Sequence, residues 1–175
     1  MWPMPTQLLS SLLLILLVGC GKAGGQLQNC VMQNNAYGAG FIDALAAVEQ
    51  HLLDTGALSE RTLEGYLTLI EAVENSERLP SLESYCTKDE NCWLLTTPAS
   101  TAAYLTCPTR IGAHNPLEET AQWGEQTGEI GGPYLRRVLN ALDEEAFEQI
   151  LYRGALLQPL VVMMEASTPD SLRDT

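Results

Sequence analysis

Basic side chains are scarce in this sequence. The chain has 175 residues, with 9 Lys and Arg against 22 Asp and Glu, and a net charge of −13. Nucleic acids and anionic lipid surfaces are both bound through clustered cations. The composition therefore excludes nucleic acid as a partner, and it excludes a membrane attachment that depends on basic residues.

Motifs for catalysis, cofactors and metals are also missing. The chain has only 2 histidines, and it contains no nucleophile elbow, P-loop, HExxH segment, EF-hand loop or CxxC pair. Five residues separate Cys86 from Cys92, which does not suit the usual zinc-ligand spacing. The sequence thus predicts no metal and no cofactor, and it favours a non-catalytic protein.

Long apolar runs are absent, but one short run stands at the N-terminus. Residues 8–18 read LLSSLLLILLV, about eleven apolar or small residues. This length is typical of the hydrophobic region of a signal peptide and is too short for a helix that spans a bilayer. The preceding MWPMPTQ departs from the usual pattern because it has no Lys or Arg. We expect residues 1–19 to be a signal peptide.

The run ends in LVGC, residues 17–20, which resembles the lipobox of bacterial lipoproteins. The resemblance implies that the Cys20 thiol receives diacylglycerol and that signal peptidase II cleaves before it. In many bacteria the new amine is also acylated, for example with palmitate. Such chains together form a stable membrane anchor. Gly21, in place of Asp, implies the outer membrane, facing the periplasm, if the cell has one. The resemblance covers about the first 25 residues and does not extend to the domain behind them.

The remaining cysteines predict disulfides. With Cys20 lipidated, four of the 5 cysteines remain, and an even number outside the cytoplasm favours two bridges. The favoured pairing joins Cys86 to Cys92 across the polar segment TKDEN, and Cys30 to Cys107. The crossed pairings stay open: Cys30–Cys86 with Cys92–Cys107, or Cys30–Cys92 with Cys86–Cys107.

Helical periodicity dominates the rest of the chain. Phe41, Leu45, Val48 and Leu52 recur at spacings of four, three and four, which is typical of one apolar helix face. Similar patterns predict helices over residues 41–53, 60–75, 98–106, 116–123, 133–142 and 143–158. We expect an all-α fold, a small disulfide-linked bundle of about five helices, with 41–53 and 60–75 forming an antiparallel hairpin.

Capping residues and a proline indicate where the helices are expected to begin and end. The predicted N-caps are Ser59, Thr97 before Pro98, and Asn115 with a capping-box Glu118. Pro159 is expected to kink or end the last helix. The chain then divides into a signal peptide (1–19), a lipidated N-terminus with a flexible Gly-rich tether (20–29), a helical domain (30–166) and a polar tail (167–175).

The sequence gives only weak site candidates: His114, Glu118 and Trp123. Loop structure and helix capping also account for His114 and Glu118. We expect a lipid-anchored, non-catalytic interaction or accessory protein of an envelope complex, with another envelope protein as partner and an exposed apolar groove to receive it. One alternative is a small-ligand binding lipoprotein, which requires a pocket. The other is a cell-wall hydrolase, which requires a cleft near His114 or Trp123.

Overall fold

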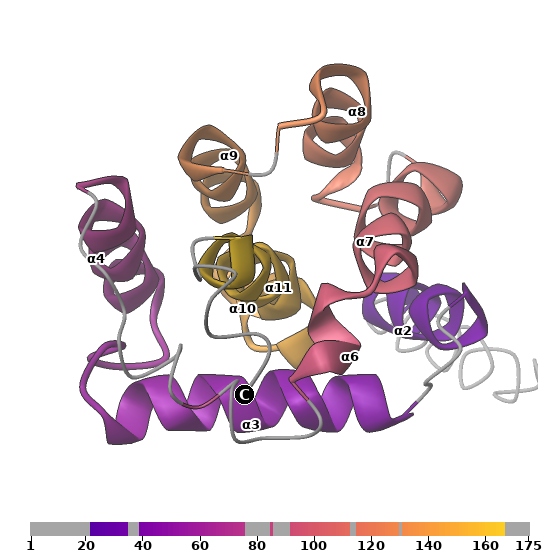
Figure 1. The fold of residues 1–175 in the computed structure, drawn as a ribbon. Coiled ribbons are helices and arrows are strands. Elements are labelled where there is room, and N and C mark those ends of the chain that lie inside the picture. The colour runs from indigo at the N-terminus through magenta and orange to yellow at the C-terminus, as the bar shows by residue number, and fades with distance from the viewer. Residues whose placement is uncertain are drawn as a thin grey trace, which may run out of the picture.

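The computed structural model describes residues 22–34, 39–75, 85, 92–112, 115–129 and 131–166. These residues contain nine α-helices and no strand (Figure 1), which confirms the all-α fold. The number exceeds the predicted five. In chain order the helices are α2 (Lys22–Asn34), α3 (Ala39–Asp54), α4 (Leu63–Glu74), α6 (Trp93–Thr96), α7 (Pro98–Ile111), α8 (Glu118–Thr127), α9 (Gly132–Ala141), α10 (Glu144–Phe147) and α11 (Ile150–Ala166).

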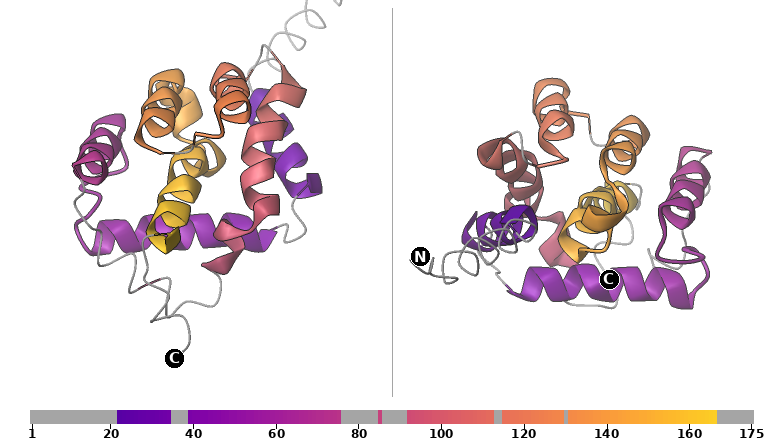
Figure 2. Two further views of the ribbon diagram at one scale, coloured as in Figure 1. Left: turned by 45° about the horizontal axis from the view of Figure 1, so that its top comes forward. Right: turned by 180° about the vertical axis from the view of Figure 1, so that it is seen from behind.

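Helix α11 is the centre of the domain. Figures 1 and 2 show it enclosed by other helices, and it packs against α3, α6, α7 and α9. Every residue from 151 to 161 is buried. A helix that is apolar all round must be covered on all sides, so the other helices form a shell around α11.

Of the two predicted effects of Pro159, a kink or an end of this helix, the structure excludes the end. Helix α11 continues through it to Ala166. The neighbours Leu157, Leu160 and Val161 are completely buried, and burying such side chains contributes about 1.5–3 kcal/mol each. This burial offsets the missing backbone hydrogen bond, which with the ring clash costs about 3 kcal/mol.

Two predicted helix starts are confirmed. Thr97 caps α7, because its hydroxyl accepts from the Ser100 N–H at 3.1 Å. Pro133 lies in the first turn of α9.

Other helix ends differ from the prediction. The cap of α4 is Thr62 and not Ser59. Helix α7 continues past Thr106 through Pro108, and α8 continues past Trp123 to Thr127. Asn115 does not cap α8 either, because its side chain accepts from the Leu117 N–H in the turn before the helix, at 2.9 Å.

The predicted antiparallel hairpin does not form. Figure 1 shows α4 rising from the end of α3 instead of lying along it, and α4 packs mainly against α9. Arg136 of α9 supports this placement by pairing with Glu74 of α4, with Nε 2.8 Å from both carboxylate oxygens. The short connection between α3 and α4 therefore directs α4 away from α3 instead of back along it.

The segment predicted as a flexible tether is helical from Lys22 onward. Leu27 and Val31 of α2 are 0% and 1% exposed, and α2 packs along α7. Burying these two side chains offsets the helix penalty of the glycines, about 1 kcal/mol each.

The structure contains the Cys30–Cys107 disulfide of the favoured pairing, with Cα atoms 5.7 Å apart. It joins α2 to α7. Cys92 is also disulfide-bonded. The predicted Cys86–Cys92 bridge involves Cys86, which lies outside the described residues.

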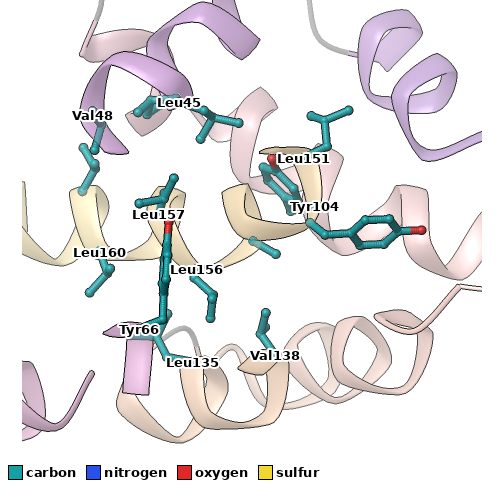
Figure 3. Close-up of a cluster of buried hydrophobic side chains, with 14 of the residues drawn as sticks. Leu45, Val48, Tyr66, Tyr104, Leu135, Val138, Leu151, Leu156, Leu157 and Leu160 are labelled. Carbon is teal, nitrogen blue, oxygen red and sulfur yellow. The ribbon is translucent and has the colours of Figure 1, made fainter. Parts of the chain in front are cut away.

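The core includes one tight contact between α7 and α11. Tyr104 and Leu45 lie in the buried cluster beside α11 (Figure 3). A Cβ on Gly154 would overlap the Tyr104 hydroxyl and come within 2.7 Å of Leu45 Cδ1. Glycine is therefore required at position 154 for α7 and α3 to approach α11 this closely.

Several predictions concern residues outside the described part of the chain: the signal peptide (1–19), the lipid attachment at Cys20, the site candidate His114 and the polar tail (167–175). Among the described helices, none combines the length and apolarity needed to cross a bilayer.

Candidate functional site

The two described site candidates, Glu118 and Trp123, both belong to α8. The Glu118 carboxylate accepts from Gln122 Nε2 at 3.2 Å, one turn along the same helix. The half-buried Trp123 ring lies beneath the Arg137 guanidinium of α9, with Cζ 4.6 Å from the ring centroid. The structure thus connects Trp123 to a residue that the sequence did not suggest.

A cavity of about 290 Å³ lies between α8 and α9, next to this pair of side chains. Thr120 is buried, whereas Glu119, Arg137 and Asn140 are exposed. The cavity therefore opens to solvent and presents one acid, one base and two neutral polar groups. Its lining residues are Pro116, Glu119, Thr120, Arg137, Asn140 and Ala141.

Gly124 allows the helices beside the cavity to pack closely. A Cβ at this position would lie 3.0 Å from both Leu105 Cδ2 of α7 and Tyr134 Cε2 of α9. Because real Cβ atoms rarely approach other side chains so closely, a larger residue would push α8 outward. Position 124 thereby helps set the spacing of α8 and α9.

Arg137 has no carboxylate or hydrogen-bonding partner among the described residues, although it touches Trp123. Its neighbour Arg136 pairs with Glu74, and Arg110 donates to Asn34 Oδ1 at 2.8 Å. A cation–π contact with an indole occupies none of the five N–H donors of a guanidinium in a hydrogen bond to an oxygen or nitrogen acceptor. Arg137 is therefore held in place with its donors available.

A second polar cluster is buried around Glu49 of α3. This side chain is 2% exposed, and Arg153 of α11 is 8% exposed. Arg153 donates through Nε to Oε1 at 2.5 Å and through Nη2 to Oε2 at 3.1 Å. The Tyr66 hydroxyl donates to Oε1 at 2.6 Å, and Arg61 Nε donates to Oε2 at 3.0 Å.

These partners set the ionisation of Glu49. Burial alone would raise the pKa of its carboxyl, but the hydrogen bonds from Arg153 and Tyr66 and the charges of Arg153 and Arg61 lower it further than burial raises it. Glu49 stays ionised as a result. Burial and the adjacent carboxylate raise the pKa of the Tyr66 hydroxyl far above its usual value, which keeps it a donor.

The Glu49 cluster is built to hold helices together. Both carboxylate oxygens accept two hydrogen bonds each, and Arg153 Nη1 donates to the Phe147 carbonyl at 2.7 Å. A saturated, buried charge cluster has no group left for a substrate. It ties α3, α4 and α11 to one another.

Sequence reasoning missed both regions, although the Glu49 cluster left a signal in the sequence. Arg153 stands alone in the apolar segment ILYRGALL, and a lone charge in a buried helix requires a partner. Arg137 and Asn140 carry no such signal, because exposed polar residues on a helix are ordinary.

Large apolar side chains are exposed at two separate places in the described part of the chain, which gives no support to the predicted apolar groove there. Leu67 of α4 and Trp93 of α6 are the large apolar side chains exposed there, at 36% and 49%. These two helices do not pack against each other. The cavity beside Arg137 is a polar hollow of this described surface.

No known protein family, curated protein or solved structure shows significant similarity to this chain. Its function therefore has to be argued from its own residues.

Proposed function

We propose that the protein is a lipid-anchored lipoprotein of the cell envelope, exported through its N-terminal signal peptide and held through Cys20. We favour the outer membrane, facing the periplasm. In this proposal it acts as a non-catalytic interaction or accessory protein. The observation that carries the proposal is the LVGC segment at residues 17–20, at the end of a short apolar run.

The arrangement of α2 supports this proposal. This helix starts two residues after Cys20, and its Leu27 and Val31 are buried. The Cys30–Cys107 disulfide bonds it to α7. Disulfides persist in oxidising compartments such as the periplasm, and a helix joined to the core would hold the domain close to its lipid.

The surface supports a polar partner more than an apolar one. The chain carries a net charge of −13, and few large apolar side chains are exposed in its described part. Complementary charge accelerates association and selects partners. We therefore propose an envelope protein with a basic surface, in place of the apolar helix that a groove would receive.

The anchor is tested by growing cells with labelled palmitate and separating their membranes. We expect label on the wild-type chain and none on Cys20→Ala, which should leave the membrane fraction. The matched control is the double variant Cys30→Ala/Cys107→Ala, which loses a disulfide but should keep the label. An unlabelled wild-type chain, or a membrane-bound and unlabelled Cys20→Ala chain, would contradict the proposal.

The partner is tested by cross-linking in intact cells. We expect one envelope protein to cross-link reproducibly to the wild-type chain, and less of it to do so in high salt, because salt screens surface charges. Recovery of the monomer alone would refute the interaction role.

A second candidate function is the binding of a small ligand. The observation that favours it is the polar cavity between α8 and α9, where Arg137 has no carboxylate partner among the described residues. This function is compatible with the same anchor.

A further inference from the structure

We infer that the cavity between α8 and α9 binds a small zwitterion, specifically a short peptide with free ends. Its carboxylate would contact Arg137 and its ammonium would contact Glu119. This inference rests on the ligand-binding candidate above and does not depend on the lipid anchor.

Arg137 supplies the site for the negative end. The described arginines at positions 61, 136 and 153 each pair with a carboxylate, and Arg110 donates to Asn34. Arg137 instead lies over the Trp123 ring and lines the cavity. A guanidinium fixed by stacking loses little conformational entropy when it binds, and its donors match a carboxylate with two parallel hydrogen bonds. A chain with so many acids has many carboxylates for its arginines, so an available one beside a cavity points to an external acid.

Glu119 makes a purely anionic ligand unfavourable. It lines the same cavity and forms no ion pair with a described residue. A phosphate or sulfate bound to Arg137 would face this like charge, which disfavours it. A ligand with a positive end complements Glu119 as well, so both charges of the cavity are matched.

The remaining lining residues suit a peptide backbone. Thr120 has a hydroxyl and Asn140 has an amide, and both line the cavity. Together they can donate to and accept from a peptide unit. Pro116 and Ala141 add apolar surface, which suits small side chains.

The volume limits the length of the peptide. The cavity measures about 290 Å³, the lower end of the range for small-molecule sites, about 300–1,000 Å³. A dipeptide fits this space, and a longer peptide would extend into solvent.

The test titrates the full-length protein, purified in mild detergent, with alanyl-alanine and follows its backbone amides by NMR. We expect saturable shifts at residues 117–123 and 137–141, with a dissociation constant in the millimolar range. N-acetyl-alanyl-alanine lacks the ammonium, and alanyl-alanine amide lacks the carboxylate. Each should bind at least about tenfold more weakly, because each loses one charge-assisted hydrogen-bonded contact.

Matched variants compare each charged residue of the cavity with a neighbouring residue of the same charge. Arg137→Ala should weaken binding at least about tenfold, whereas Arg136→Ala should bind normally. Glu119→Gln should weaken binding, whereas Glu118→Gln should not, because the Glu118 carboxylate bonds to Gln122. If a variant fails to fold, N-acetyl-alanyl-alanine and alanyl-alanine amide still test the need for both charged ends of the ligand, because they are used with the unmodified protein.

Three outcomes would overturn the inference: no saturable shift, equal binding of the acetylated peptide, or normal binding by Arg137→Ala. Palmitate labelling of the same preparation tests the lipid anchor independently of the peptide site. A labelled protein that ignores alanyl-alanine refutes the peptide site alone, and an unlabelled protein that binds it refutes the anchor alone.

Discussion

Two arginines of this domain lie in opposite surroundings. Arg153 is 8% exposed and shares the Glu49 carboxylate with Tyr66 and Arg61. Arg137 is exposed, stacks on Trp123 and has no carboxylate partner among the described residues. Arg153 bonds inside the protein through Nε, Nη1 and Nη2, whereas Arg137 forms no hydrogen bond with a described residue.

This difference distinguishes an arginine with a structural role from one that is a candidate for binding a ligand. A buried charge is tolerated only when it is paired, so the Glu49 cluster is explained by the fold that it stabilises. An exposed charge needs no protein partner because water solvates it, so Arg137 beside the cavity keeps its donors available to a ligand. The charged group with unsatisfied bonding capacity, and not the one in the strongest electrostatic contact, is therefore the better functional candidate.

Among the proposed substitutions, Arg153→Met is expected to lower the free energy of unfolding the most. Removing one partner of a buried ion pair leaves Glu49 with only the half-exposed Arg61 as its cation, and we expect a loss of about 3–5 kcal/mol in the free energy of unfolding. Arg137→Met should change this quantity by less than about 0.5 kcal/mol, as is usual for surface substitutions. Urea unfolding followed by circular dichroism measures both. Equal losses would remove the distinction between the two arginines.

Gly154→Ala tests the packing beside the Glu49 cluster. The added methyl group would overlap the Tyr104 hydroxyl, and overpacking of this kind costs about 1–3 kcal/mol. Gly25→Ala on α2 is the matched control, because no atom lies within 4 Å of its added Cβ. It should gain up to about 1 kcal/mol from helix propensity. Stabilisation of the Gly154→Ala protein in thermal unfolding would show that the core is looser than described.

The pH dependence of unfolding tests the ionisation of Glu49. Its pKa is lower when folded than its ordinary value of 4.5. The stabilisation is therefore complete above about pH 4.5 and is lost as the pH falls through the folded pKa. Glu49→Gln should unfold more easily at neutral pH and show a flatter acid dependence. An unchanged acid dependence would indicate that other carboxyls cause it.

Glu74→Gln is the comparison for this measurement. Its pairing with Arg136 also lowers the pKa of the Glu74 carboxyl. Because this pair is at the surface, we expect a smaller change in acid dependence.

Arg61→Ala is expected to have a small effect on the free energy of unfolding. Arg61 also contacts Glu49, but its side chain is 47% exposed, and pairs open to water contribute about 0–1 kcal/mol. A loss in urea unfolding as large as that of Arg153→Met would show that the cluster depends on its outer arginine as well.

Local patterns in the sequence predicted much of the fold. The apolar stripe from Phe41 to Leu52 corresponds to α3, and Thr97 and Pro133 mark helix starts where expected. Tertiary packing overrode the other local signals. Gly24 and Gly25 indicated a tether, but the burial of α2 on α7 made the segment helical, and Pro159 did not stop a helix whose neighbouring residues are all buried.

The cavity could not be predicted from local patterns. Trp123 was a candidate, but Arg137 is on another helix, and their contact depends on how α8 packs against α9. The position of Gly124 between Leu105 and Tyr134 contributes to that packing, and a lone glycine in a helix does not reveal its contacts. The Glu49 cluster likewise unites residues from α3, α4 and α11, which no sequence spacing connects.

The central claim is that the domain functions from a lipid anchor on Cys20. Intact mass spectrometry of the full-length gene product, purified from membranes, tests it most directly. We predict a chain that begins at Cys20 and exceeds its peptide mass by a diacylglyceryl group, with or without a further acyl chain. A chain that retains residues 1–19, or one that begins at an unmodified Cys20, would contradict the claim.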